Sequence, residues 1–308
     1  MGSPEPRSGP PESPYETLWR FARERHAAWE RRIGGLPPPW TLDPVLLRHR
    51  FTCVYRVLDR VSQRLVRSVI GADDLGRDET FFRVALFKAF NREETWDLLR
   101  EELGDEPSLA GFSVGKYARI LAAAPGPVFT GAFITPSGMQ YGAKTMFENH
   151  LRRVDRMIAD GLPGRLSRTE SLQQAYLEIR RWPAMGPFLA FQLAVDLNYS
   201  RAVYDHPEDW AQPGPGAVSG MKKCGTTVAQ VVADQASYGF KGLPGRSLTH
   251  VDAEHLLCEA DKYLRVSRPE LAGNGRVRMK RGIAGMGDRP LESLALPGKW
   301  VSAFKGKW

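Results

Sequence analysis

The amino-acid sequence predicts an all-α protein that folds as one compact multi-helix domain. Along most of the 308 residues, apolar side chains recur every three or four positions, as they do on the buried face of an amphipathic helix. The strict apolar-polar alternation of a half-buried strand is scarce. Short runs rich in proline and glycine, at 36–39, 125–127 and 213–216, separate the periodic segments without a long flexible linker.

The helices can be placed from this periodicity. A long helix is expected over 43–70, where one apolar stripe has seven positions, and a second is expected over 79–90. Asn91 and Glu94 are expected to cap a third helix that runs through residue 99. Further helices are expected over 113–124, 144–160, 169–181, 188–198, 227–237 and 249–267.

The charge of the chain favours a polyanionic partner. Lys and Arg number 43 against 35 Asp and Glu, which gives a net charge of +8 and a pI near 9.5. Most of this surplus lies in 271–308, where Trp300, Phe304 and Trp308 alternate with lysines. Rings that stack beside cations that bind phosphate suit a nucleic acid. A solvated terminus that charge keeps soluble explains the same composition.

The chain is expected to be cytoplasmic, without a metal or an organic cofactor. Its three cysteines, Cys53, Cys224 and Cys258, are too few and too scattered for a disulfide framework or a zinc site. No stretch approaches the roughly 20 apolar residues that a membrane-spanning helix needs. The first 14 residues lack the apolar run of a signal peptide or membrane anchor. The oligomeric state stays open.

Two short turns are candidates for contacts with phosphate. Segment 182–190 joins two expected helices through a Pro-x-x-Gly turn that resembles the helix-hairpin-helix element of DNA glycosylases. Segment 213–217 is rich in glycine, which lets a backbone approach a ligand, and it precedes Lys222 and Lys223. An ordinary helix-helix turn and a plain loop explain these two patterns equally well. The segment 111–117 fails the P-loop pattern, so kinase-like phosphate chemistry is set aside.

Segment 250–265 carries the candidate catalytic carboxylates. On a helix, Asp252 and Glu259 line up along the edge of the apolar face, where partial burial would raise a pKa toward the range of a general acid or base. A helix cap at Thr249 and ion pairs along the helix surface account for the same residues. Asp209 is the carboxylate nearest to the place where hairpin glycosylases carry their catalytic aspartate, although its surroundings match poorly.

Several blocks together resemble one protein family. They are 39–44 (PWTLDP), 50–60 (RFTCVYRVLDR), 86–91 (LFKAFN) with 95–96 (TW), 186–190 (GPFLA), 196–199 (DLNY), 214–217 (GPGA) and 258–263 (CEADKY). This set resembles the helical domain of 5-hydroxymethyluracil DNA kinases and the alpha-glutamyl/putrescinyl thymine pyrophosphorylase group, which are considered relatives of the helix-hairpin-helix DNA glycosylases. The resemblance implies a helical fold of helix-hairpin-helix glycosylase-like character that acts on a flipped-out modified base in DNA.

The resemblance does not imply one reaction. The first expectation is a DNA glycosylase, a hydrolase that flips out and excises a hydroxymethylated or glucosylated pyrimidine in anti-phage defence, and it is expected to be monofunctional because no lysine nucleophile follows the hairpin turn. Two alternatives stay open: a transferase that modifies an activated 5-hydroxymethyluracil in DNA, and a non-enzymatic module that binds modified DNA. The expected catalytic residues are Asp252, Glu259 and Asp209. The residues expected at the DNA are Arg56, Lys88, Gly186, Gly214, Gly216, Lys222, Lys223, Lys262 and Arg265.

Three segments are expected along the chain. Residues 1–38 form a Pro-rich N-terminal tail and a lead-in helix, residues 39–270 form the helical domain that processes the DNA base, and residues 271–308 form the basic, aromatic C-terminal tail.

Overall fold

The computed structural model describes residues 12–71, 75–131, 139–272, 294–297 and 300. Within these residues the backbone forms thirteen α-helices and no β-strand, which confirms the all-α prediction; one isolated bridge pairs Leu243 with Arg246. The expected tail at 1–11 and most of the expected basic tail lie outside the described residues. No described helix is long and apolar enough to cross a membrane.

The α-helices are α1 (Pro14–Ile33), α2 (Pro44–Arg48), α3 (Arg60–Arg64), α4 (Arg77–Phe90), α5 (Glu93–Leu103), α6 (Val114–Ala122), α7 (Met146–Ala159), α8 (Leu162–Leu166), α9 (Leu172–Arg180), α10 (Pro187–Leu197), α11 (Pro215–Cys224), α12 (Val228–Asp234) and α13 (His250–Ser267). Shorter helical turns are the 3-10 helices η1 (Arg56–Leu58), η3 (Met139–Tyr141) and η4 (Pro269–Leu271) and the π-helix η2 (Leu65–Ile70).

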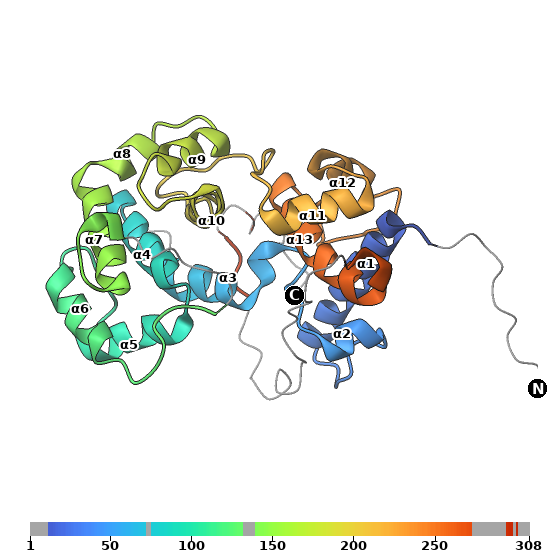
Figure 1. Cartoon of the computed structure of the whole chain (residues 1–308), viewed down its shortest axis with the longest axis horizontal. Coiled ribbons are helices and arrows are strands. Elements are labelled where there is room, and N and C mark those ends of the chain that lie inside the picture. Colours follow the sequence, from blue (N-terminus) through green and yellow to red (C-terminus); the bar gives the residue numbers. More distant parts are fainter. Residues whose placement is uncertain (1–11, 72–74, 132–138, 273–293, 298–299, 301–308) are drawn as a thin grey trace, which may run out of the picture.

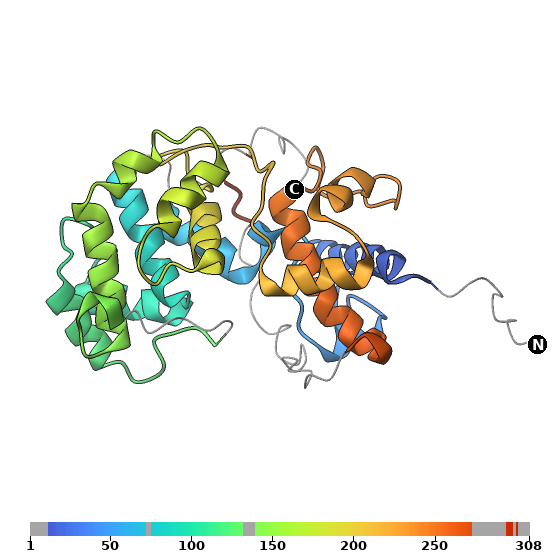
Figure 2. The same ribbon diagram turned by 45° about the horizontal axis from the view of Figure 1, so that its top comes forward.

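The helices gather in two groups (Figure 1). The central part of the chain, from α3 to α10, forms one group, and α1, α2, α11, α12 and α13 form the other; both views show this division (Figure 2). Helix α1 packs on α13, although the two come from opposite ends of the chain. The ring of Phe21 on α1 lies 4.8 Å from that of Tyr263 on α13, and both side chains are buried. This contact makes the expected lead-in helix part of the core.

Helix α11 lies against α13, and glycines make that approach possible. A Cβ added at Gly220 would overlap the carbonyl of Leu257, and one at Gly216 would overlap the sulfur of Cys258. The amide N–H of Gly214, at the N-cap of α11, donates to Glu254 Oε1 at 2.9 Å. The glycine-rich segment 213–217 therefore serves helix packing in this structure, where the sequence suggested a phosphate-binding turn or a loop.

The prediction of one long helix over 43–70 is wrong. The segment contains α2, an extended stretch, η1, α3 and η2. Its apolar stripe is nevertheless mostly buried, for example at Phe51 and Val54. In the extended stretch the amide N–H of Thr52 donates to Glu259 on α13 at 3.1 Å. The apolar residues are buried against other elements without a continuous helix, because tertiary contacts outweigh a periodicity of 3.6.

Most other helices lie within a few residues of their predicted positions. Asn91 does not begin α5; it ends α4 in the left-handed conformation, with a φ of 48°, and its N–H donates to the carbonyl of Phe87 at 2.7 Å. Asparagine tolerates this conformation better than most residues, so it also serves as a C-cap. The short helix α8 and helix α11 were not predicted from the periodicity.

Candidate nucleic-acid interface

Helices α9 and α10 form a hairpin with a tight turn. Its Ala184 has a left-handed φ of 61°, and the N–H of Met185 donates to the carbonyl of Trp182 at 3.1 Å. The hydroxyl of Tyr141 donates to the carbonyl of Pro183 at 3.0 Å and ties the turn to the rest of the helix group. Gly186 is the N-cap of α10, and a Cβ there would meet nothing within 4 Å. Two hydrogen bonds therefore hold the turn, and its glycine is not required by packing.

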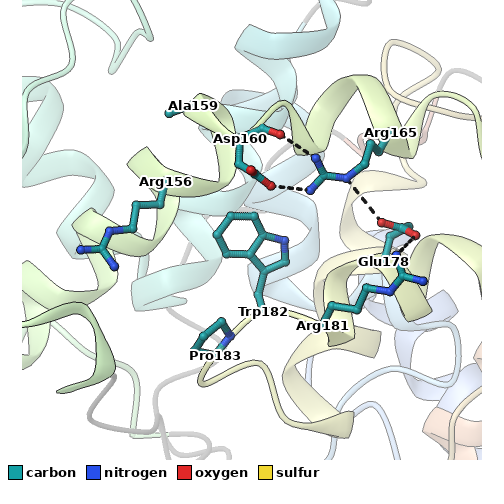
Figure 3. Close-up of a pocket in the computed structure, with 8 residues that line it drawn as sticks. All are labelled: Arg156, Ala159, Asp160, Arg165, Glu178, Arg181, Trp182 and Pro183. Carbon is teal, nitrogen blue, oxygen red and sulfur yellow. Dashed lines mark hydrogen bonds and ion pairs between the residues drawn. The ribbon is translucent and has the colours of Figure 1, made fainter.

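An open groove of about 700 Å³ lies beside this turn (Figure 3). Its lining residues come from the end of α7, from α8 and from α9 with the turn: Arg156, Ala159, Asp160, Arg165, Glu178, Arg181, Trp182 and Pro183. Figure 3 shows the indole ring of Trp182 between Arg156 on one side and Arg165 and Arg181 on the other. The groove thus combines an aromatic ring with cations on both sides.

The groove has more cations than carboxylates. Arg165 pairs with Asp160 at 2.8 Å and with Glu178 at 3.5 Å, and Arg181 pairs with Glu178 at 2.8 Å. The guanidinium of Arg156 lies over the Tyr141 ring, 5.4 Å from its centroid, and no ion pair joins it to a carboxylate among the described residues. Arginine forks bind phosphates, and an indole ring stacks on a base. This surface suits a nucleic-acid strand.

A buried charge cluster lies between η1, α4 and α10. Asp196 on α10 pairs through one carboxylate oxygen with Arg56 Nη2 at 2.6 Å and through the other with Lys88 Nζ at 2.8 Å. Arg56 also donates to the Tyr199 hydroxyl at 2.8 Å and to Gln192 Oε1 at 2.9 Å. The three charged side chains are between 2% and 9% exposed. They join elements that are far apart in the sequence.

The charges of this cluster depend on one another. Burial by itself raises the pKa of Asp196, but the adjacent charges of Arg56 and Lys88 outweigh it and hold the pKa below its ordinary value. Burial lowers the pKa of Lys88, although the Asp196 charge opposes this shift. Asp196 is therefore an ionised carboxylate that two buried cations share.

Sequence reasoning expected Arg56 and Lys88 at the DNA but did not single out their partner. In the structure both cations are buried in the cluster, so a direct contact with DNA stays a prediction that would require the cluster to open. Asp196 carried a usable signal, because it is the one ionisable residue in segment 187–197, where Gln192 is the only other polar side chain. A charged residue in such a helix needs a buried partner.

The two expected catalytic carboxylates of α13 each have structural partners. Asp252 forms a capping box with Thr249, and its carboxylate also lies 3.4 Å from Arg246. Glu259 pairs with Lys262 and accepts the N–H of Thr52. Burial raises the pKa of Glu259, but Lys262 and then His255 outweigh it and hold the pKa below its ordinary value. The structure does not bring the two carboxylates to one site.

The remaining expected residues lie apart from the groove. Asp209 is exposed, whereas its neighbour Glu208 is buried and pairs with Arg246 at 2.6 Å. On α11 and α13, Lys223 and Arg265 both pair with Asp261, at 2.5 and 3.1 Å. Lys222 on α11 is exposed. The lysines and Arg265 belong to the helix group of α1 and α13, and Asp209 lies in the loop between α10 and α11, while the groove lies on α7, α8 and α9.

Asp252 provides a pH prediction. Its pKa is raised to about 6, first because the carboxyl group is buried and further because Glu208 is close, while Arg246 opposes the shift. The folded state therefore favours the protonated form, so the free energy of unfolding should fall by about 2–3 kcal/mol as the pH rises from about 4 through 6. Asp252→Asn should remove this fall. Urea denaturation across the pH range measures it.

The control for this prediction is Asp160→Asn, which removes an exposed carboxylate of the groove. It should leave the pH dependence as in the unmodified protein. An unchanged fall in Asp252→Asn would show that another group is responsible.

No three His, Cys, Asp or Glu side chains within the described ranges are arranged to hold a metal ion.

The comparisons with known proteins point to one family. The family model described as "5-hmdU DNA kinase, helical domain" matches residues 12–273. The chain is also 28% identical over 233 residues to a 5-hmdU DNA kinase of Bacillus phage SP10. The matched region covers 67% of this chain and 36% of the phage protein. The chain thus spans about a third of that relative's length. No solved structure matches.

These matches overturn the expected reaction. Both carry the name of a kinase, which transfers a phosphoryl group and does not hydrolyse an N-glycosidic bond. The expectation of a DNA glycosylase, of hydrolase chemistry and of excision of the base is therefore wrong. The alternative of a transferase that acts on 5-hydroxymethyluracil agrees better with both matches. The described structure shows a helical hairpin but does not by itself establish glycosylase-like character.

Proposed function

Because the chain belongs to the family of the 5-hmdU DNA kinase helical domain, we propose that it binds DNA that contains 5-hydroxymethyluracil and takes part in group transfer to the hydroxymethyl oxygen of that base. The observation that carries this proposal is the family match across residues 12–273, which includes both helix groups. The name of the phage relative supports the same substrate.

Within this reaction the chain is assigned the DNA side. The sequence pattern of a phosphate-binding P-loop, Gly-x-x-x-x-Gly-Lys-Ser/Thr, does not occur among the 308 residues. The proposal therefore gives these helices the task of binding the DNA and presenting the modified base, and it assigns the phosphoryl donor to a P-loop supplied by another segment or another polypeptide.

The groove beside the hairpin is the proposed DNA contact. Arg156 and Arg181 would bind backbone phosphates, and Trp182 would stack on a base or sugar. The N-terminus of α10, which begins at the adjacent turn, has backbone N–H groups without intrahelical partners that suit a further phosphate. These contacts would position the strand without reading its sequence, so recognition of the modified base must come from other side chains.

The test compares three DNA duplexes of one sequence that differ at a single base: 5-hydroxymethyluracil, thymine or 5-hydroxymethylcytosine. Fluorescence anisotropy should show the tightest binding to the first. Incubation with ATP and Mg²⁺, followed by digestion and mass spectrometry, then asks whether the nucleoside gains a phosphoryl group, both with the chain alone and with the phage SP10 kinase present. Equal affinity for all three duplexes would overturn the proposal. Release of a free base would show that the chain is a glycosylase after all.

A further inference from the structure

A small cavity lies under the hairpin, between α4, α7 and α10. Two cationic side chains line it, Lys88 from α4 and Arg153 from α7. The rest of the lining is apolar and includes Met157, Met185 and Leu189. The cavity shares no lining residue with the groove, and the proposed reaction assigns it no role.

Arg153 is a buried guanidinium without an ionic partner. The residue is 5% exposed, and its buried Nη1 atom has no hydrogen-bond partner. Among the described residues no carboxylate forms an ion pair with it, whereas the other two buried cations, Arg56 and Lys88, both pair with Asp196. Burial lowers the pKa of Arg153 to about 10, which still leaves the side chain charged at neutral pH. A buried donor that makes no hydrogen bond requires a physical explanation.

The second cation of the cavity does not help to neutralise the first. Arg56 and Lys88 both pair with the one carboxylate of Asp196, so this ion pair leaves the charge of Arg153 without a counter-charge. An uncompensated charge in the interior is destabilising. An anion in the cavity would compensate this surplus and complete the hydrogen bonds of Arg153.

We propose that this cavity is a subsite for a phosphate group, held between Arg153 and Lys88. A guanidinium offers a planar fork of N–H donors to two phosphate oxygens, and an ammonium adds a compact point charge. The phosphate group comes either from DNA or from free phosphate. The subsite stands independently of the proposed function, because it rests on the cavity and its two cations alone.

Binding requires the cavity to widen. Its volume is about 10 Å³, which is the room for about one water molecule. Two walls are Met157 and Met185, whose unbranched side chains adapt to a new shape at little cost. Met185 belongs to the turn of the hairpin, so a change in its side-chain conformation would enlarge the cavity without moving a helix.

The test is thermal unfolding of the full chain in sodium phosphate and in sodium chloride at the same ionic strength. Phosphate should raise the Tm by about 3 °C or more, because it binds the folded state. Arg153→Met should lose this rise and should also unfold at a higher temperature than the unmodified protein in chloride, since it removes an unpaired buried charge. The same phosphate-dependent rise in Arg153→Met would overturn the proposal.

Two further variants keep the test decisive. Arg119→Met removes an exposed arginine of α6 that has no ion pair among the described residues, so it should keep the phosphate effect in full. Ala89→Leu fills the cavity without changing a charge, so it should lose the effect even if Arg153→Met fails to fold. A rise that persists in Ala89→Leu would show that phosphate acts elsewhere and would overturn the proposal.

The source of the phosphate group is found by competition. If the subsite takes a DNA phosphate, free phosphate at constant ionic strength should weaken DNA binding in the unmodified protein and not in Arg153→Met. If it takes free phosphate, DNA and phosphate should bind together without competition. Competition and simultaneous binding each support the subsite only if Arg153→Met no longer binds phosphate.

Discussion

Replacement of Asp196 by alanine is expected to lower the free energy of unfolding by about 3–5 kcal/mol, which is the largest effect on stability predicted for a single side chain of this protein. The substitution leaves Arg56 and Lys88 buried without their shared carboxylate, which lies 2.6 and 2.8 Å from them. The cost arises from the two stranded cations more than from the lost ion pair itself. Chemical denaturation at neutral pH measures it.

The matched control is Asp205→Ala. Asp205 pairs with Arg201 at 3.2 Å, but both side chains are largely exposed, so its loss should cost at most about 1 kcal/mol. The pH dependence provides a second check. The folded state lowers the pKa of Asp196. Its contribution to the free energy of unfolding is therefore present above the ordinary aspartate pKa, and it is lost as the pH falls through the lower pKa of the folded state. Equal losses in the two variants would disprove the special role of Asp196.

Charge reversal in the groove is expected to have the largest effect on DNA binding. The double variant Arg156→Glu with Arg181→Glu should weaken binding at least about tenfold at moderate salt, because two phosphate contacts become repulsive. The slope of log affinity against log salt should become less steep by about 2. Both side chains are exposed, so the fold should remain intact. Anisotropy titrations at several salt concentrations measure both quantities.

Lys222→Glu reverses the charge of an exposed lysine on α11, in the other helix group, and leaves in place Lys223, which pairs with the buried Asp261. The sequence pattern alone placed DNA near these two lysines, whereas the groove lies on α7, α8 and α9. Affinity and salt slope should change little in this variant. The opposite result, with the α11 variant impaired and the groove variant normal, would move the DNA surface to α11.

The sequence determined the local features of this protein. Helix α13 runs from His250 to Ser267, as its periodicity predicted, and Thr249 caps it through its own side chain. Ser113 caps α6 in the same way. Such features depend on residues within one or two turns, so the sequence states them directly. The resemblance of several blocks also identified the family, although the reaction inferred from it was wrong, because a hairpin pattern and a pair of carboxylates do not distinguish phosphoryl transfer from base excision.

Only the tertiary structure decided what each charged residue does. Arg56, Lys88 and Asp196 are separated by 32 and 108 positions in the chain, yet they form one buried cluster. The sequence placed Asp252 and Glu259 on one helix edge and offered a cap at Thr249 and ion pairs along the helix as the alternative. It could not show that Arg246 and Thr52 also contact them. The pKa and the chemistry of a carboxylate are set by burial and by the charges around it. Some of those neighbours, such as Thr52 beside Glu259 and the two cations beside Asp196, come from distant segments, so they are in place only once the chain has folded.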